Sequence, residues 1–373
     1  MLLVQAYLRS VGTLESLKGQ YAINYRVDDK LGVVCLNYNQ IESNLALSIV
    51  QECRQLILEL DTWNVVSISF EKFFNYSEQR SPDFNWSNFK TYEKLDGSIV
   101  TFWHHKNYGW QLATRSIPNG EASVDDSGLT FKELVMLTLE DMGLSFELVT
   151  SFMEPGYSYI TELCCPENQV VVHHQVRSLT LLAVRSIQEP YFKECDLETW
   201  ASWNSNFPLP LVALYDGFSL EAVLAAVQGR KPIEHEGYVL VDKNFNRVKI
   251  KSDLYILLSH QRDGLGKSEK TRLALVLSEQ DDDIMGLLPK FVQDKITNLK
   301  IRVTDLAKKI DSDYQSVKDI ETQKGFALVV MDPETNFVYP AMFAMRKGIC
   351  STGMEYIKHA SQMTILRLLG LDE

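Results

Sequence analysis

The segment Thr91-Tyr92-Glu93-Lys94-Leu95-Asp96-Gly97-Ser98 decides how the rest of the chain is interpreted. It places Lys94 two residues before an Asp-Gly turn, ahead of a run from Ile99 to Trp103 that we predict to be a strand. Taken alone, the pattern favours a hairpin with a solvated lysine, because Asp-Gly is a common hairpin turn. A nucleophilic lysine must instead lose its proton, which requires burial or neighbouring cations to lower its pKa. The question is whether the sequence supplies those neighbours.

The composition is that of a soluble globular protein, with 45% hydrophobic and 23% charged residues. The length of 373 residues predicts two domains. No apolar window is long enough for a membrane span, and the first ten residues lack a signal-peptide pattern, so we expect a cytoplasmic protein without a membrane partner. The net charge is −12, and most of the acidic excess lies in residues 1–255. Any contact with nucleic acid must therefore be local, through a few lysines and arginines gathered in a cleft.

The cysteines indicate neither zinc binding nor a disulfide framework. None of the six belongs to a Cys-x-x-Cys pair, and a disulfide between the adjacent Cys164 and Cys165 would be strained. We therefore expect the chemistry of this chain to use lysines and carboxylates.

Hydrophobic periodicity predicts an α+β domain over residues 1–255 and an all-helical domain over residues 256–373, with the boundary between residues 255 and 265. In the first domain we predict strands over residues 31–38, 55–60, 65–70, 98–104, 109–115 and 179–184, and helices over residues 2–17, 41–51, 129–142, 197–203 and 220–228. Residues 77–88 are predicted to be a surface loop. In the second domain we predict helices over residues 267–277, 284–310, 314–331 and 354–369.

Charged residues recur at the ends and turns of the predicted strands. The cations are Arg54, Lys72 and Arg115, together with Lys249 and Lys251, which share one face of a strand. The carboxylates are Asp96, Glu162 and Glu236, where Glu236 lies on the strand that precedes the two lysines in a predicted hairpin. We prefer Glu162 to Glu147, because a turn and a strand follow Glu162 whereas Glu147 lies near a helix end.

This set of residues meets the requirements of nucleotidyl transfer onto an amine. Cations neutralise a triphosphate and lower the pKa of the nucleophile, and carboxylates hold ribose hydroxyls and Mg²⁺. The sequence has neither a P-loop nor a Gly-x-Gly-x-x-Gly motif, so we do not expect a P-loop or Rossmann site.

The ordered motifs resemble those of the covalent nucleotidyltransferases, the polynucleotide ligases and capping enzymes, whose first motif is Lys-x-Asp-Gly. Within that group the chain is most similar to the RNA ligase 1 family of T-even phages, which repairs tRNA. The resemblance covers most of residues 30–255 and is carried by Glu52-Cys53-Arg54, Glu71 to Asn75, Lys94 to Ser98, Glu162 with Pro166 and Asn168, Leu182 to Arg185, Glu236 to Val239, and Lys249 to Asp253 with Tyr255.

The resemblance implies a nucleotidyltransferase domain with ATP-grasp-like antiparallel sheets and flanking helices. It implies that ATP adenylylates Lys94, that Arg54 and Lys72 contact the nucleotide, and that Glu162 binds its ribose. Glu236 resembles the metal-linked carboxylate, and Lys249 and Lys251 resemble the lysines that contact the phosphates. Further nucleotide contacts are implied for Tyr38, Asp96, Gly97, Arg115 and Tyr255. The metal is expected to be Mg²⁺, with Mn²⁺ as a substitute.

Two departures from the family pattern lie within these motifs. Gln55 follows the motif arginine, where the family commonly has glycine. A lysine pair on the strand after the first motif is replaced by Ala113 and Arg115, which retains one charge.

We therefore expect a monomeric ATP-dependent RNA ligase that joins a 5′-phosphate to a 3′-hydroxyl through lysyl-AMP and RNA-adenylate intermediates, in RNA or tRNA repair. One alternative is a DNA ligase or a capping guanylyltransferase. These enzymes usually carry a C-terminal OB-fold barrel, whereas the periodicity of residues 256–373 predicts helices. Another is an RNA-end-binding protein without catalysis, which would not need to keep Lys94, Glu236 and both hairpin lysines together.

The C-terminal domain offers candidate contacts to a structured RNA such as a nicked tRNA. Basic residues cluster at Lys267 to Arg272 and at Arg346-Lys347. These clusters could contact RNA phosphates, and the alternative is that they form a solvated helix surface. Asp281-Asp282-Asp283 is predicted to cap a helix that starts at Ile284, with the alternative that Asp282, which aligns with a metal-contacting residue of the family, binds a second Mg²⁺.

Overall fold

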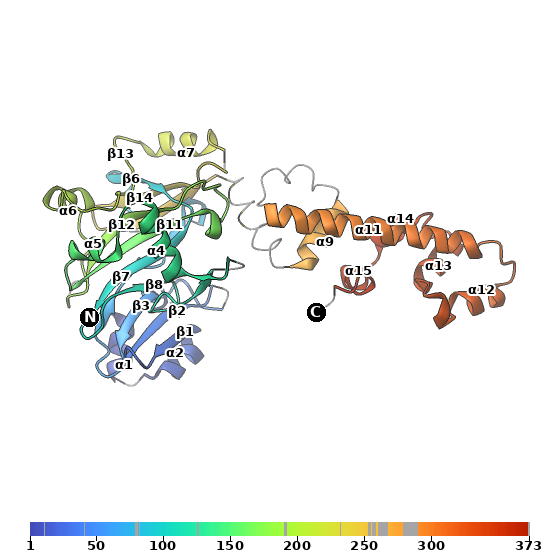
Figure 1. Cartoon of the computed structure of the whole chain (residues 1–373), viewed down its shortest axis with the longest axis horizontal. Coiled ribbons are helices and arrows are strands. Elements are labelled where there is room, and N and C mark those ends of the chain that lie inside the picture. Colours follow the sequence, from blue (N-terminus) through green and yellow to red (C-terminus); the bar gives the residue numbers. More distant parts are fainter. Residues whose placement is uncertain are drawn as a thin grey trace. The chain divides into compact units, whose positions relative to one another are not determined.

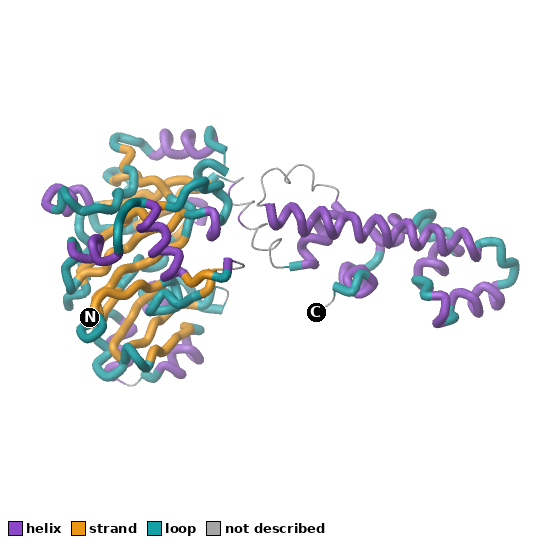
Figure 2. The backbone as a smooth tube through the Cα atoms, in the orientation of Figure 1, coloured by secondary structure: helices purple, strands orange, loops and turns teal. Residues whose placement is uncertain are grey.

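The chain forms two compact units, Met1–Tyr255 and Ile256–Glu373, in the computed structural model. The structure describes residues 1–10, 12–40, 42–78, 81, 83–124, 127–189, 192–231, 233–252, 255, 259, 268–278 and 290–371. No helix in these ranges is long and apolar enough to cross a membrane. The first unit is built on sheets with helices around them, and the described part of the second unit contains helices without strands (Figures 1 and 2).

The first sheet of unit 1 is antiparallel, with the order β1-β2-β3-β4. Its strands are β1 (Ile23–Asp28), β2 (Val33–Tyr38), β3 (Arg54–Glu59) and β4 (Val65–Ser67). The helices α1 (Leu3–Ser10), α2 (Leu14–Tyr21) and α3 (Ser48–Gln51) lie beside it (Figure 1). Its core includes Leu36, Leu56 and Leu58, all fully buried.

Two larger sheets form the remainder of unit 1. One has the order β12-β11-β7-β8, with β7 (Ser98–His105), β8 (Gly109–Ala113), β11 (Tyr157–Cys164) and β12 (Ser178–Ser186). Its hydrophobic core also contains buried side chains from the helices α4 (Phe131–Asp141), α5 (Phe146–Ser151) and α6 (Leu197–Trp203). A small hairpin of β9 (Ser123–Val124) and β10 (Leu129–Thr130) precedes α4.

The other sheet has the order β13-β6-β14-β15-β5. Its strands are β5 (Phe74–Asn75), β6 (Phe89–Lys94), β13 (Leu214–Tyr215), β14 (Gly237–Asp242) and β15 (Arg247–Lys251). The helix α7 (Leu220–Gln228) covers one face through Val223 and Val227. The predicted hairpin of β14 and β15 is present, with Gly237 opposite Lys251.

The Lys94 corner joins two sheets and is not a hairpin turn. β6 pairs with β14 and β13, whereas β7 pairs with β11 and β8, so the chain changes sheets between Lys94 and Ser98. Gly97 makes this crossing possible, because a Cβ atom there would lie 2.2 Å from the carbonyl oxygen of Leu163. The Asp-Gly pattern, which taken alone favours a hairpin, does not form one here, because β6 and β7 pair with other strands and not with each other.

Several predicted helices are shorter or divided in the structure. The helix predicted over residues 2–17 is two helices, because Thr13 caps a new one at α2. The helix predicted over residues 41–51 is reduced to α3, and the strand predicted over residues 65–70 ends at Ser67. β1 was not predicted, although the apolar Ile23, Tyr25 and Val27 alternate with polar residues in its sequence.

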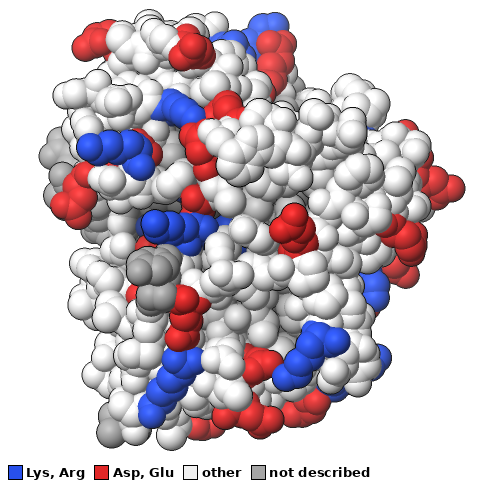
Figure 3. All heavy atoms as spheres, turned by 90° about the vertical axis from the view of Figure 1, so that its left-hand side faces the viewer, with Lys and Arg blue, Asp and Glu red and all other residues white. Residues whose placement is uncertain are grey.

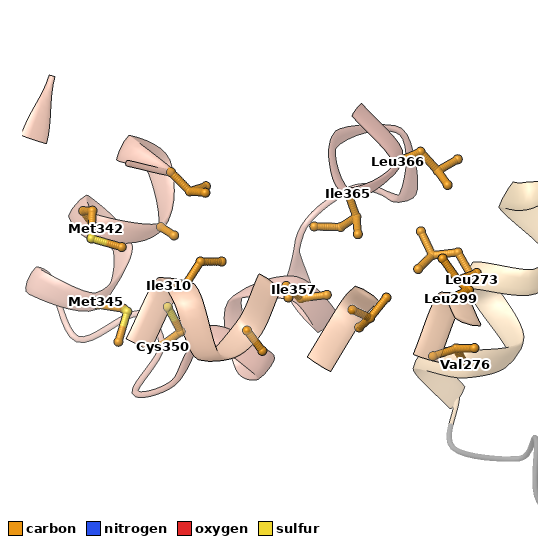
Figure 4. Packing of buried hydrophobic residues seen from close by; sticks show 14 of the residues in the cluster. Leu273, Val276, Leu299, Ile310, Met342, Met345, Cys350, Ile357, Ile365 and Leu366 are labelled. Atoms are coloured by element: carbon orange, nitrogen blue, oxygen red, sulfur yellow. The ribbon is translucent and has the colours of Figure 1, made fainter. Parts of the chain in front are cut away.

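The α-helices in the described part of unit 2 are α9 (Glu269–Ser278), α11 (Lys290–Val317), α12 (Gln323–Val330), α13 (Tyr339–Arg346), α14 (Gly353–His359) and α15 (Gln362–Leu368). Its buried side chains form one cluster along α11, including Leu299, Ile310 and Met342 (Figure 4). The helices predicted over residues 314–331 and 354–369 are each divided, because Thr322 and Ser361 cap new helices. The predicted cap at Asp281 to Asp283, and Asp282 as a metal ligand, lie outside the described residues.

We predict that Gly97→Ala lowers the free energy of unfolding of unit 1 by more than an alanine substitution at a glycine that has only an unfavourable φ. The added Cβ would collide with the backbone at Leu163, and backbone cannot move aside as a flexible side chain can. Gly32→Ala is the control, because Gly32 has a φ of +64° but no atom within 4 Å of the added Cβ. Thermal unfolding should show a clearly larger loss for Gly97→Ala, and equal losses would contradict the proposed collision.

Candidate active site

A cleft of about 870 Å³ opens within unit 1 between the two larger sheets. Ile99, Glu162 and Leu182 line it from the sheet of β7, β11 and β12. Lys94, Val239 and the β15 residues Lys249 and Lys251 line it from the other sheet. Arg54, Gly97 and Arg115 complete one end. Seven predicted residues from separate motifs therefore line one cavity, whereas the lining does not include Tyr38, Lys72, Asp96, Glu236 and Tyr255.

Lys94 is held by a buried carboxylate. Its Nζ lies 2.7 Å from Glu236 Oε2, and Lys251 Nζ lies 2.6 Å from Glu236 Oε1. The Glu236 side chain is only 3% exposed. Glu236 immediately precedes β14, whose Gly237 is opposite both Lys94 and Lys251 in the sheet. The register of β6, β14 and β15 thus places these three charges together.

The pKa of Lys94 is raised, contrary to the sequence-based expectation that neighbouring cations lower it. Burial by itself would lower this pKa, but the nearby carboxylates of Glu236 and Glu162 outweigh burial. In turn, burial would raise the pKa of Glu236, but Lys94 and Lys251 lower it overall. Without a ligand, Lys94 is therefore an ammonium ion in an ion pair with Glu236.

In contrast to the pKa of Lys94, the pKa of Lys249 is lowered, first by burial and then by neighbouring cations. Burial lowers it to about 7, with further contributions from Lys72, Lys251 and Lys94. Glu162 changes in the opposite direction: burial raises its pKa to about 7, and Glu236 adds to this effect while Lys94 opposes it. Both groups therefore titrate near neutral pH in a site that carries concentrated charge.

Arg54 enters the cleft from a bulge at the start of β3. Asn37 pairs with Arg54 and Leu36 with Leu56, so Gln55 is the extra residue, and its φ of +58° is the conformation that glycine favours. Gln55 is accommodated because its side chain donates to the carbonyl of Ala113 at 2.7 Å and accepts from Thr101 Oγ1 at 3.0 Å. Gln55 therefore adopts a backbone conformation typical of glycine and adds two buried hydrogen bonds.

Aromatic rings lie against the cations of this end. The Arg54 guanidinium lies 5.3 Å from the Phe73 ring centre, and the Arg115 guanidinium lies 5.0 Å from the Tyr38 ring centre. Lys72 Nζ is 5.8 Å from the same Tyr38 ring. The structure thus brings Tyr38, Arg115 and Lys72 together at this side of the site. Such contacts hold cations in place without neutralising them.

Asp96 fastens the lysine corner and does not face the cleft. Its Oδ2 accepts from the backbone amides of Val171 and Val172 at 2.7 and 2.6 Å, and its Oδ1 accepts from the Tyr255 hydroxyl at 2.6 Å. Both oxygens of this 4%-exposed residue are thus engaged. The sequence grouped Asp96 and Tyr255 with the ligand-binding residues, whereas the structure shows them holding the turn that carries Lys94.

The comparisons with known proteins agree with the motif order. The RNA ligase family model of the T4 RNA ligase 1 type matches residues 52–255, which is more than half of the chain. The chain belongs to this RNA ligase family. Family membership accounts for the order of the motifs from Arg54 to Tyr255.

Two curated relatives extend the similarity. The chain is 28% identical over 294 residues to a putative bifunctional polynucleotide kinase/RNA ligase of Autographa californica nuclear polyhedrosis virus, covering 74% of this chain and 40% of the relative. It is 25% identical over 349 residues to an RNA ligase of Rhodothermus phage RM378, covering 75% of this chain and 78% of the relative.

Solved structures similar to the chain include further RNA ligases. An archaeal ATP-dependent RNA ligase gives a TM-score of 0.45 at 14% identity and covers 89% of this chain and 77% of its own. A Naegleria gruberi RNA ligase variant with AMP and manganese gives 0.39 at 16% identity, covering 51% of this chain and 57% of its own.

Sequence reasoning did not identify the far end of the cleft. Arg247 continues the alternating series of Lys249 and Lys251 on β15, so its position was available from the spacing. Its partner Glu194 lies in a connection between β12 and α6 without a periodic pattern, and no sequence signal indicated it.

We predict that binding of an ATP analogue takes up a proton through Lys249. Phosphate should raise the pKa of Lys249 from about 7 back toward its usual value, so affinity should increase as the pH falls from about 9 to about 7. Titration calorimetry in buffers of different ionisation enthalpy would measure this uptake, which should approach one proton at about pH 8.

Lys249→Arg keeps the positive charge but cannot lose its proton, so this variant should take up fewer protons than the wild type. Identical proton uptake in the two proteins would assign the linkage to another group.

Proposed function

We propose that this protein is an ATP-dependent RNA ligase that uses Lys94 as its nucleophile. The observation that carries the proposal is the convergence of Lys94, Glu162 and a group of cations on one cleft, with the buried Glu236 paired to Lys94. In the first step the Lys94 amine would attack the α-phosphorus of ATP, forming a P–N bond as the bond to pyrophosphate breaks. Arg54, Lys249 and Lys251 would stabilise the charge on the phosphates.

The later steps would use the same cleft. An oxygen of an RNA 5′-phosphate would displace Lys94 from AMP, and an RNA 3′-hydroxyl would then attack the activated phosphate and release AMP. The strongly cationic end of the cleft suits the successive binding of triphosphate and RNA phosphate, in a chain whose net charge of −12 otherwise disfavours polyanions. On the face drawn in Figure 3, basic side chains are scattered among acidic ones, so this face does not present an extended basic surface.

The carboxylates of the site fit a divalent cation such as Mg²⁺ or Mn²⁺. Magnesium is usually held by one or two carboxylates together with substrate phosphates, and Glu162 and Glu236 both act electrostatically on Lys94. Bound there, the cation would offset the negative charge that keeps Lys94 protonated. Glu162 and Glu236 would hold it, while Glu236 also keeps Lys94 and Lys251 aligned.

We predict that Lys94→Arg abolishes covalent labelling by ATP, although the positive charge is retained. Arginine stays protonated and cannot act as the nucleophile. The measurement is incubation with α-labelled ATP and a divalent cation, followed by denaturing electrophoresis. Lys106→Arg is the matched control, because Lys106 is exposed, pairs with Glu59 and lies outside the residues that line the cleft. Labelled Lys94→Arg would assign the nucleophile to another residue.

We further propose that residues 256–373 select a structured RNA, such as a tRNA broken in its anticodon loop. The support is a separate hydrophobic core, which indicates a unit able to serve a separate purpose. The arginines named from the sequence contribute less than expected. Arg272 is buried and paired with Glu269, and Arg346 donates to the carbonyl of Ile320 at 2.8 Å. Lys270 and Lys347 remain on the surface.

We predict that a chain ending at Leu258 still labels Lys94 and joins simple single strands, but does not prefer nicked tRNA to unstructured RNA. The described residues that line the cleft all lie within residues 54–251, which explains why the first activity should survive. Competition between the two RNAs in a joining assay measures the preference. Loss of labelling from a truncated protein that remains folded would show that the C-terminal unit contributes to the active site.

A further inference from the structure

Two exposed aromatic side chains lie against each other beside the cleft. The ring centres of Tyr76 and Trp86 are 5.4 Å apart, and the angle between the ring planes is 72°. Tyr76 is 38% exposed and Trp86 is 40% exposed. In the described part of the chain, this is the only ring–ring contact in which both residues are exposed. Single exposed rings are common on protein surfaces, whereas gathered ones mark a surface that binds something.

Trp86 is supported from beneath by the core of the five-stranded sheet. Its ring centre lies 4.6 Å from that of Phe84, which is only 4% exposed and packs in the hydrophobic cluster of β14, β15 and α7. The Asn85 amide donates to Asp242 Oδ2 at 3.0 Å, which fastens this segment to the end of β14. The ring is therefore positioned before any ligand binds, and such preorganisation lowers the entropic cost of binding.

Tyr76 is joined to the cationic end of the cleft. It directly follows Asn75 of β5, which is opposite Lys249 in the parallel pairing of β5 with β15. Glu78 accepts from the Asn75 amide at 3.0 Å and from its Nδ2 at 2.6 Å, which closes the turn that carries Tyr76. Burial by itself would raise the pKa of Glu78, but the hydrogen bonds from Asn75 and the charges of Lys72 and Lys249 lower it. The turn therefore lies within electrostatic reach of both cations.

The spacing of these residues suits a nucleotide strand. Neighbouring strands are about 4.8 Å apart and each residue advances by about 3.3 Å, so the Cα atoms of Tyr76 and Lys249 are about 6 Å apart. Lys249 lines the cleft, and so does Asn88, two residues after Trp86. A strand with one phosphate at Lys249 can therefore place a nearby base on the aromatic pair.

The proposed chemistry says which strand passes this way. In an in-line displacement the entering group approaches on the side opposite the leaving group. Pyrophosphate leaves on the side opposite Lys94 in the first step, and the RNA 5′-phosphate enters on the side opposite Lys94 in the second. The two groups therefore use the same position, and the RNA behind its 5′-phosphate leaves the cleft along the cations that face that position.

We propose that Tyr76 and Trp86 stack a base of the RNA strand whose 5′-phosphate enters the cleft. This inference rests on the proposed function, in which that phosphate accepts AMP from Lys94. Aromatic side chains beside a cationic groove are typical of proteins that bind single-stranded nucleic acid. The nearby charges of Lys72 and Lys249 favour a polyanion over an apolar segment of protein. Because every base has a π-face, the contact should accept all four bases.

The test is the transfer of AMP from labelled Lys94 to a 5′-phosphorylated single strand in Trp86→Ala and Trp86→Leu. Leucine keeps an apolar contact with Phe84 but cannot stack on a base. In single-turnover measurements, we expect the RNA concentration that gives half the maximal rate to rise roughly tenfold in both variants. The labelling of Lys94 by ATP should change far less, because that step involves no RNA. Trp86→Phe should restore most of the affinity for RNA.

Two matched comparisons separate stacking from a general loss of affinity. Trp203→Ala removes a tryptophan that is 83% exposed and does not line the cleft, and it should behave as the wild type. A series of RNAs that each lack one base near the 5′-phosphate locates the stacked nucleotide. One of them should bind the wild type as weakly as intact RNA binds Trp86→Ala, and Trp86→Ala should lose nothing further with that RNA.

An unchanged dependence on RNA concentration in both Trp86→Ala and Trp86→Leu would overturn the inference and leave the proposed function intact. Equal effects of Trp86→Ala and Trp203→Ala would do the same, as would an equal loss of ATP labelling and RNA affinity in the Trp86 variants. Loss of self-association in sedimentation without an effect on RNA would assign the rings to a contact between protein chains. A wild type that takes no label from ATP, or never passes it to RNA, would instead contradict the proposed function itself.

Discussion

The buried carboxylate of Glu236 is the constraint on which the site depends. It accepts from the ammonium groups of Lys94 and Lys251, which would otherwise be two buried like charges close together. Removing one partner of a buried charge pair is costly, because the remaining charge loses its compensation. The sheet keeps these groups together: Gly237, which follows Glu236, is opposite both lysines, and a Cβ there would lie 2.0 Å from the carbonyl oxygen of Ile250. The Glu-Gly pair thus combines a charge with close packing of strands.

The same interaction keeps Lys94 protonated in the ligand-free site, and a protonated amine could not act as the proposed nucleophile. The carboxylates stabilise protonated Lys94, while the accumulated cations destabilise protonated Lys249. Phosphates would reverse the second effect, and a divalent cation on the carboxylates would offset the first. If Lys94 is the nucleophile that we propose, its activation would be coupled to the arrival of its substrates, which would limit reaction of a free lysine with other electrophiles. Sequence alone could not give this result, because it depends on which charges are nearest.

The sequence predicted the parts of the fold that local patterns determine. The helices α6 and α7 match their predicted bounds, and the hairpin of β14 and β15 places Lys249 and Lys251 on one face as expected. Errors occur where a longer-range feature decides. Thr13, Thr322 and Ser361 divide apolar runs that looked continuous, since a capping side chain restarts a helix without changing the hydrophobic period. The crossing at Gly97 was not predictable either, because the partners of β6 and β7 are distant in sequence.

The site was predictable where residue types repeat a family motif, and less so where contacts are made by connecting segments. Asp96 was identified by its motif, but its contacts could not be assigned, because its partners Val171 and Val172 carry no recognisable signal and the motif residue Tyr255 is 159 positions away in the sequence. Glu194 is the same case at the opposite end of the cleft. Motif residues provide charges that the chemistry requires, whereas the residues that orient these charges need only to reach them from the fold.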